Sequence, residues 1–267
     1  MQHRKFIATS FMTFSVFLLM ACNPSGSVGS GNSTPSSGES TLAAPTAEST
    51  AVPAPISSGS CTNPLYPVAA GVTWDYTLSG TVNDTFVRKI NSVDMSGFED
   101  QDTFSTGVTR TGEWKCDNGA LIALDPSGGS SANVQLSTAS GDFTTSSMSG
   151  VTLPATINAG DTWSQSTTLE GTVTFNARQA DATNDFTNDC TANGNEDISV
   201  AAGNFNAMKV TCQTHMVITI TIEGASVPTT IDINTISWYA PGVGLVKALS
   251  TGNDFDTTTE LTSYVIP

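Results

Sequence analysis

The stretch HMVITITIEG, from His215 to Gly224, decides the fold class, because its side chains alternate with the period of a β-strand. One face would carry Met216, Ile218, Ile220 and Ile222, and the other His215, Val217, Thr219 and Thr221. The next stretch, ASVPTTIDINTISWY, ends at Tyr239 and alternates in the same way over its second half. Together the two stretches predict a long hairpin that turns near Gly224.

Strand-like alternation extends over most of the chain after Cys61. Short runs such as TWDYTL, GTVTFNA and FNAMKVTC are separated by Gly, Asn, Asp and Ser residues, which favour turns. The pattern predicts about ten to twelve strands, and no segment of about a dozen residues keeps the apolar stripe of a helix. The composition agrees, since 23 residues are Gly and only 12% are charged. We therefore predict an all-β domain of antiparallel meanders.

An internal repeat is visible within this domain. LYPVAAGVTWDYTLSGTV and LPATINAGDTWSQSTTLEGTV both carry Pro, then Ala-Gly-x-Thr-Trp, then a strand ending in Gly-Thr-Val. Each half also contains a second tryptophan, followed by Gly and Leu. The two tryptophans lie 40 positions apart in the first half and 75 in the second, which predicts an added hairpin in the second half. The equivalent pairs are Trp74 with Trp163 and Trp114 with Trp238.

The repeat predicts one domain from about Cys61 to Pro267, with half-repeats at about residues 65–150 and 151–267. Each half would be one meander with one apolar face, and neither half could bury that face alone. The two faces are therefore expected to close on each other in a sandwich or a half-barrel.

The beginning of the chain has the features of an export signal. Arg4 and Lys5 precede an apolar segment that ends at Met20 and is too short to span a hydrocarbon core of about 30 Å comfortably. The segment runs into Leu-Met-Ala-Cys, which resembles the lipobox of bacterial lipoproteins. The resemblance implies that residues 1–21 are a lipoprotein signal peptide and that Cys22 carries a diacylglycerol thioether, usually with a further acyl chain such as palmitate. Two or more acyl chains hold a protein stably on a membrane. The alternative is an ordinary signal peptide cut just before an incidental cysteine.

Residues 22–60 are predicted to form a tether between the lipidated cysteine and the domain. From Asn23 to Ser60 the chain is mainly Ser, Gly, Thr, Pro and Ala, with Glu39 and Glu48 as its only charges and no aromatic residue. Such a segment has too little apolar surface to offset its conformational entropy, so we expect a disordered stalk. Its root-mean-square span would be roughly 35 Å, from about 5 to 6 Å times the square root of its length.

The cysteine count supports an oxidising compartment. Assigning Cys22 to lipid leaves four of the five cysteines, whose spacing fits neither a zinc knuckle nor a thioredoxin-like site. Two structural disulfides are the better interpretation, with four buried free thiols as the alternative. Sequence alone permits three pairings. We prefer the pairing that keeps each bridge within one half of the repeat: Cys61 with Cys116, and Cys190 with Cys212.

Charge limits the possible partners. Acidic residues outnumber basic ones by 24 to 9, which gives a net charge of −15 at pH 7. Nucleic acid is excluded as a partner, because its phosphates need a Lys/Arg surface. Electrostatic binding to anionic headgroups is disfavoured for the same reason. The expected membrane contact is therefore the lipid on Cys22.

The sequence carries no motif for catalysis, a metal or a cofactor. His215 would be the single histidine of the mature chain, and neither a second histidine nor a Gly-x-Ser-x-Gly motif supports it as a base. Carboxylates cluster in several predicted loops, among them DATNDFTND, but none follows the spacing of an EF-hand, so solvated loops are preferred over calcium sites. We expect a protein that is not an enzyme and holds no cofactor.

The four tryptophans are the candidate ligand-binding residues. Exposed in a row, Trp74, Trp114, Trp163 and Trp238 would stack on sugar rings and form a carbohydrate-binding face. Their repeat-equivalent positions beside Gly and apolar residues favour the alternative, in which they anchor the core.

Three segments, YPVAAGVTWDY, VAAGNFNAMKV and WYAPGVGLVK, resemble a family of uncharacterised bacterial envelope proteins and lipoproteins. In that family a P-x-x-x-G-x-x-W-x-Y opening, a G-x-F-x-A-x-K-V hairpin and a closing W-Y-A-x-G-V-G-x-V-K recur. The resemblance covers most of residues 64–267, and the closing motif is its most specific part. It implies an antiparallel sheet, curved like the half-barrels of periplasmic lipoprotein carriers, and it implies no activity.

The sequence thus predicts a lipid-anchored, non-catalytic protein on the extracytoplasmic side of a bacterial cell envelope, at the cell surface or in the periplasm. Its β domain would bind an apolar ligand or another envelope component. One alternative is a carbohydrate-binding or adhesive surface module with a glycan partner. Another is a hydrolase with an unrecognised site. An apolar cavity, an exposed row of Trp and Tyr, or paired carboxylates near His215 would distinguish the three.

Overall fold

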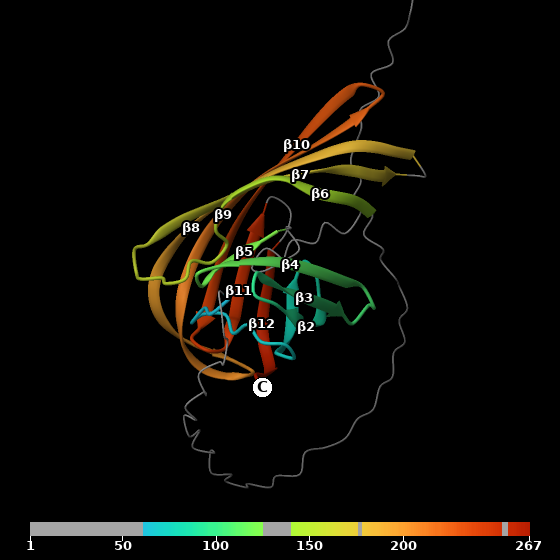
Figure 1. Cartoon of the computed structure of the whole chain (residues 1–267). Helices are drawn as coiled ribbons and strands as arrows, with labels where there is room; N and C mark the ends of the chain where they lie inside the picture. The colour runs from blue at the N-terminus through green and yellow to red at the C-terminus, as the bar shows by residue number, and fades with distance from the viewer. Residues whose placement is uncertain (1–60, 125–139, 176–177, 253–255) are drawn as a thin grey trace, which may run out of the picture. The chain divides into compact units, whose positions relative to one another are not determined.

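The computed structural model describes residues 61–124, 140–175, 178–252 and 256–267 (Figure 1). These residues form twelve β-strands and no helix, so the all-β prediction is confirmed. The predicted signal peptide, the tether and Cys22 lie outside the described residues. In the described ranges we find no helical segment of the length and hydropathy needed to cross a membrane.

The strands follow the alternation seen in the sequence. Every second side chain of the first strand is buried from Trp74 to Leu78. The first six strands are β1 (Thr73–Gly80), β2 (Asp84–Val93), β3 (Gly97–Phe104), β4 (Thr109–Asp117), β5 (Ala120–Ala123) and β6 (Ser140–Gly150). The last six are β7 (Thr162–Phe175), β8 (Arg178–Val200), β9 (Gly203–Ile222), β10 (Ala225–Ala240), β11 (Gly244–Gly252) and β12 (Asp256–Val265).

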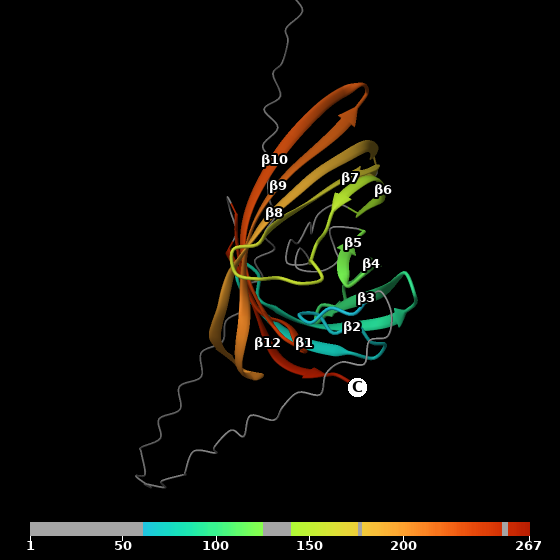
Figure 2. The ribbon, with the colours of Figure 1, turned by 60° about the vertical axis from the view of Figure 1, so that its left-hand side comes forward.

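All twelve strands belong to one antiparallel sheet, in the order β5-β4-β3-β2-β1-β12-β11-β10-β9-β8-β7-β6. The first and last strands pair with each other, with Trp74 opposite Tyr264 and Leu78 opposite Thr259. The second meander therefore continues the sheet of the first and does not stack on it as a separate layer. Of the two predicted arrangements, the structure has the curved sheet, which bends round its own core (Figures 1 and 2).

The two edge strands, β5 and β6, are joined at one end by backbone and side-chain hydrogen bonds. Leu121 of β5 forms an isolated bridge with Leu153, just after β6. The backbone N–H of Ala123 donates to Thr152 Oγ1 at 2.8 Å, and Gln165 Nε2 donates to the Ala123 carbonyl at 2.8 Å. These bonds hold the two edges together there, although β5 and β6 do not pair as strands.

The length difference between the halves lies in the strands themselves. Two strands lie between the two tryptophans of each half. They are β2 and β3 between Trp74 and Trp114, and β8 and β9 between Trp163 and Trp238. However, β8 and β9 have 23 and 20 residues, whereas β2 and β3 have 10 and 8. The prediction of an added hairpin is therefore wrong. A longer spacing between two residues in the sequence can come from more strands or from longer strands, and here it comes from longer strands.

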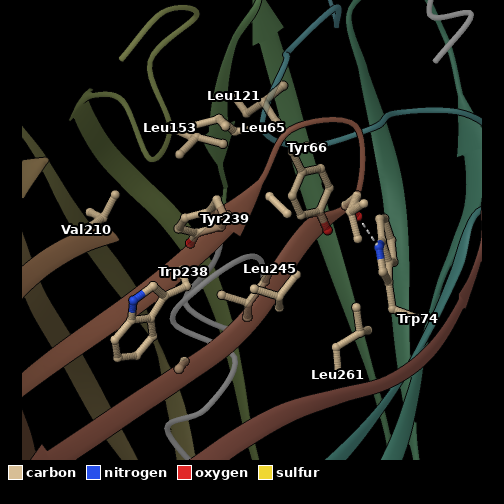
Figure 3. Close-up of a cluster of buried hydrophobic side chains, with 14 of the residues drawn as sticks. Leu65, Tyr66, Trp74, Leu121, Leu153, Val210, Trp238, Tyr239, Leu245 and Leu261 are labelled. Atoms are coloured by element: carbon tan, nitrogen blue, oxygen red, sulfur yellow. Dashed lines mark hydrogen bonds between the residues drawn. The ribbon is translucent and has the colours of Figure 1, made fainter. Parts of the chain in front are cut away.

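The opening and closing motifs pack against each other in the core. Trp74 is 1% exposed, and its indole Nε1 donates a hydrogen bond to the carbonyl of Val243 (Figure 3). The hydroxyl of Tyr76 donates to the carbonyl of Leu245 at 2.8 Å. Gly244 lies between these two carbonyls at φ +107, and a Cβ there would come within 3.2 Å of Trp74 Nε1. The glycine therefore allows the indole to approach the backbone closely.

Two disulfides join the pairs preferred from the sequence. Cys61 is bonded to Cys116, which ties the segment before β1 to β4. Cys190 is bonded to Cys212, and these two residues lie directly opposite each other in the β8–β9 pairing. All four cysteines are buried.

Candidate functional site

Part of the sheet extends past the point where β11 stops pairing. β10 pairs with β11 only from Ile233 onward, so its earlier residues have β9 as their one partner strand among the described residues. Together with the neighbouring ends of β6 to β9, these residues form a five-stranded extension that we call the distal blade (Figure 1). The distal blade consists of Phe143–Thr145, Leu169–Val173, Ala180–Asn184, Ile218–Ile222 and Ala225–Thr229.

The inner face of the distal blade continues the core-facing side of the sheet. Side chains two residues apart share one face of a strand. Ile220 therefore lies on the same face as Met216, which is 1% exposed. Ala182 likewise shares its face with the buried Phe186 on β8. The register then brings the inner-face residues of the five strands into rows.

The outermost complete row is entirely apolar. It contains Phe143, Gly171, Ala182, Ile220 and Val227, one residue from each strand, and we call it the tip row. Beyond it lie Val173 and Ile222. Ala182 and Val173 are each 4% exposed and form a small buried cluster with Phe143 and Ile220 packed against it. Val227 and Ile222 are 59% and 50% exposed, so the apolar side chains reach the surface at this end of β9 and β10. An exposed apolar surface on the core-facing side of a sheet is a typical place for an apolar ligand or partner.

A polar residue interrupts the next row towards the core. This row contains Thr145, Leu169, Asn184, Ile218 and Thr229. Asn184 is 3% exposed, and its side-chain carbonyl Oδ1 has no hydrogen-bond partner within the part of the chain that the structure describes. A buried acceptor without a partner costs about 1–3 kcal/mol, so it requires an explanation.

A second polar group, the ionic cluster of β2 and β3, lies within the core. Arg88 donates from Nε to Asp102 Oδ1 at 2.7 Å and from its Nη2 to Oδ2 at 2.8 Å. Asp100 lies 3.8 Å from Arg88 Nε and accepts a hydrogen bond from the Tyr66 hydroxyl at 3.3 Å. Burial raises the pKa of Asp100 to about 6, against the lowering effect of Arg88.

The ionic cluster leaves little room for a ligand. Arg88, Asp100 and Asp102 are each 3% exposed. The void beside Arg88 and Tyr66 measures about 10 Å³, which is close to the space that one water molecule needs. We therefore assign this cluster to the core and not to the ligand site.

The tryptophans lie in or against the core. Trp74, Trp114 and Trp238 are 1%, 5% and 5% exposed, and Trp163 is half-buried against the same cluster of side chains. The core interpretation therefore describes their position, and they form no exposed row. A contact between any of these rings and a ligand stays a prediction.

His215 and its neighbours lie on the outer face of the sheet. His215 Nδ1 is 2.7 Å from Asp232 Oδ1 on the adjacent strand, and the two side chains are 58% and 63% exposed. Among the described residues, no group of three or more His, Cys, Asp or Glu side chains is arranged to hold a metal ion. The surroundings of His215 thus consist of an exposed ion pair and not of a cleft.

A hollow of about 320 Å³ lies over β6, β7 and β8. Most of its lining is hydroxyl-bearing, with one carboxylate that accepts a hydrogen bond from Thr168 at 2.8 Å. The lining residues are Ser147, Met148, Ser149, Ser166, Thr167, Thr168, Asp185, Phe186 and Thr187. Such a surface can exchange hydrogen bonds with a hydroxylated ligand.

The sequence did not single out Asn184 or the tip row. Alternation places Ile220 and Ile222 on one face, but the strands that flank them are known only from the sheet order. Asn184 lies in DATNDFTND, a run rich in Asn and Asp that was interpreted as a loop, whereas it belongs to the 23-residue β8. Its alternating small and apolar residues, Ala182 and Phe186, were the available signal.

Comparison with known proteins gives a family and two similar solved structures. The model of the DUF3108-like family matches residues 82–266. A candidate lipoprotein from Parabacteroides distasonis has a TM-score of 0.51 at 16% sequence identity, covering 76% of this chain and 99% of that one. A candidate exported protein with a YmcC-like fold, from Bacteroides fragilis, has a TM-score of 0.47 at 16% identity, covering 75% and 98%. At such identity the first likeness shows a shared fold alone. No match was found among curated proteins.

Proposed function

The chain belongs to the DUF3108-like family, and we propose that it is an exported envelope protein, anchored by lipid at Cys22, whose distal blade binds an apolar chain along its inner face. The proposal assigns the protein a binding role without catalysis.

The tip row is the observation that carries the binding role. It continues the core-facing side of the sheet to a place where Ile222 and Val227 are half exposed or more. Each Å² of apolar surface that a ligand covers there would contribute about 25 cal/mol. The interior near the ionic cluster offers a void of only about 10 Å³, so the distal blade is the better place for a ligand.

The location outside the cytosol rests on the covalent features of the chain. Two disulfides between buried cysteines persist in an oxidising compartment and are rare in a reducing one. The lipobox-like segment before Cys22 and the Ser/Thr/Pro/Gly-rich residues 23–60 supply an anchor and a tether. A tether that spans roughly 35 Å would let the blade reach ligands near the anchoring membrane.

The absence of a catalytic step is part of the proposal. The exposed pair of His215 and Asp232 lies on the outer face, away from the apolar surface of the blade. The buried carboxylates, Asp100 and Asp102, pair with Arg88 and face the core. Neither group combines an accessible base with a ligand-sized cavity.

Photo-crosslinking in cells tests the binding role on the full chain. A benzophenone amino acid is placed at Ile220, on the inner face, and in a second variant at Thr219, which points to the outer face of the same strand. We expect a lipid-sized mass increase after irradiation at position 220 and none at 219. Equal adducts at both positions, or protein-sized adducts alone at 220, would contradict an apolar chain as the ligand.

A second candidate function, glycan binding, rests on the hollow over β6 to β8. Its hydroxyl groups and the Asp185 carboxylate suit a neutral hydroxylated ligand. A glycan array probed with the full chain tests this role, with Thr168→Val as the variant that removes the hydroxyl bonded to Asp185. Thr172→Val, four residues along the same face, is the control. Loss of a glycan signal in the first variant only is the expected result, and an array without signal removes this candidate.

A further inference from the structure

Asn184 is a polar residue in apolar surroundings. Its cross-strand neighbours on the inner face are Leu169 and Ile218, and its neighbours along β8 on that face are Ala182 and Phe186. None of these four side chains can donate a hydrogen bond. The carbonyl Oδ1 of Asn184 is buried and has no partner in the described part of the chain.

Asn188, four residues further along the same face, differs from Asn184 in that its side-chain carbonyl has a hydrogen-bond donor beside it. Thr214 lies next to it on β9 and donates from Oγ1 to Asn188 Oδ1 at 2.9 Å. The amide of Asn188 donates in turn to Cys190 Sγ at 3.3 Å. The sheet thus supplies a partner for one asparagine of this face and leaves the acceptor of the other open, one row below the apolar tip row.

From this arrangement we propose that the ligand of the distal blade is a neutral amphipath. Its hydroxyl or amide N–H donates a hydrogen bond to Asn184 Oδ1, while its apolar chain lies along Ile220 and the rest of the tip row. The inference deepens the proposed function and rests on it. The hydrophobic surface binds the apolar chain of the ligand, and Asn184 recognises its head group through a hydrogen bond.

Charge supports a neutral head over an anionic one. The atom of Asn184 that lacks a partner is its carbonyl oxygen, which accepts hydrogen bonds and repels the oxygens of a carboxylate or phosphate. The amide nitrogen of the same side chain can donate to either kind of head, so the charges around the blade decide between them. No Lys or Arg lies in any of the five segments of the blade, whereas Glu170 and Asp181 lie on its outer face. The net charge of −15 acts in the same direction.

The test compares three probes that share a fourteen-carbon chain and differ in the head: 1-monomyristoylglycerol, methyl myristate and myristate. Their binding to the full chain is measured by native mass spectrometry. We expect the monoacylglycerol, which has hydroxyl donors, to bind about tenfold more tightly than the methyl ester, which has none. Myristate should bind less tightly than the monoacylglycerol.

Two variants assign the difference to Asn184. Asn184→Leu keeps the size of the side chain and removes the acceptor, so the tenfold preference should fall to about one. This variant should fold at least as stably as the wild type, because it replaces an unpaired buried polar group by an apolar one. Thr183→Leu, the adjacent residue on the outer face, should keep the preference.

The possible results separate this inference from the proposed function. Equal binding of the monoacylglycerol and the methyl ester to the wild type overturns the role of Asn184 and leaves an apolar ligand site. Tighter binding of myristate overturns the neutral head. If no probe binds, or if Ile220→Asp leaves all binding unchanged, the proposed function itself fails.

Discussion

Arg88 and Asp102 form a bidentate ion pair across β2 and β3, in which Nε and Nη2 lie 2.7 and 2.8 Å from the two carboxylate oxygens. Both residues are 3% exposed. A pair on the outside of the sheet offers a direct contrast. Lys247 and Glu260 are also 2.7 Å apart, but their side chains are 22% and 39% exposed. The two pairs have similar geometry in opposite environments.

Removal of one partner should therefore have unequal consequences. Asp102→Ala removes the carboxylate that accepts two hydrogen bonds from Arg88 and leaves the positive charge of the guanidinium in the core. We therefore expect a loss of about 3–5 kcal/mol in the free energy of unfolding. Glu260→Ala leaves Lys247 free to reach water and should cost about 1 kcal/mol or less. Urea unfolding with the disulfides intact measures both. Similar losses in the two variants would contradict the assignment of the ionic cluster to the core.

Asp100 should make the stability depend on pH. Burial and the neighbouring Asp102 raise the pKa of its carboxyl, Arg88 lowers it, and the net result is a rise from 3.8 to about 6. The folded state then binds this proton more tightly than the unfolded state does. The contribution of the protonated Asp100 to the free energy of unfolding is largest below about pH 4. It is lost as the pH rises through about 6 and stays low above that.

Asp100→Asn should remove this dependence. The variant carries no charge at position 100, so it should be more stable than the wild type at pH 7.5, by up to about 3 kcal/mol, and should differ little near pH 4. Urea unfolding from pH 4 to 8 measures the difference between the two curves. Glu99→Gln, the neighbouring residue on the outer face, is the control and should leave the curve parallel to that of the wild type.

Gly244 should tolerate no side chain, because its backbone and its surroundings both oppose one. Its φ is +107, and a Cβ would meet the indole of Trp74 at 3.2 Å. We expect Gly244→Ala to cost at least about 2 kcal/mol, from backbone strain plus displacement of the ring. Gly107 has φ +85 and nothing within 4 Å of a Cβ, so Gly107→Ala reports the strain alone, about 1 kcal/mol. Thermal unfolding of both variants tests this ranking.

The fold class followed from the sequence because alternation is a local property. His215 to Gly224 and the residues after it show a hairpin without any knowledge of their neighbours, and the structure has β9 and β10 there. The pairing of the cysteines was also accessible, since each bridge lies within one half of the repeat.

The candidate site was not accessible in the same way. The tip row unites residues from five strands between Phe143 and Val227, and only the register decides that they meet. The tryptophans are large and repeated, which fits a ligand-binding face as well as a core, and packing places three of them in the core. Asn184 is distinguished by its apolar neighbours on the adjacent strands, Leu169 and Ile218, and no local sequence pattern around residue 184 reveals them.

The two disulfides should contribute unequally to stability. A bridge restricts the unfolded chain, and the effect grows with the loop that it closes. The loop between Cys61 and Cys116 spans 55 residues and that between Cys190 and Cys212 spans 22, which correspond to about 4 and about 3 kcal/mol. We expect the double variant Cys61→Ala/Cys116→Ala to unfold at lower urea than Cys190→Ala/Cys212→Ala. The reverse order would show that packing around the β8–β9 bridge outweighs loop entropy.

The lipid anchor predicts a modification at one cysteine out of five. Cells that express the full chain are grown with an alkyne analogue of palmitate, and the label is detected on the purified protein by click chemistry. The wild type should be labelled, and Cys22→Ala should lose the label, because the thioether forms only at the lipobox cysteine. Cys212→Ala is the control: it frees one thiol in the β domain and should keep the label on Cys22. A labelled Cys22→Ala variant, or an unlabelled wild type of unmodified intact mass, would remove the anchor and with it the proposed position of the distal blade near a membrane.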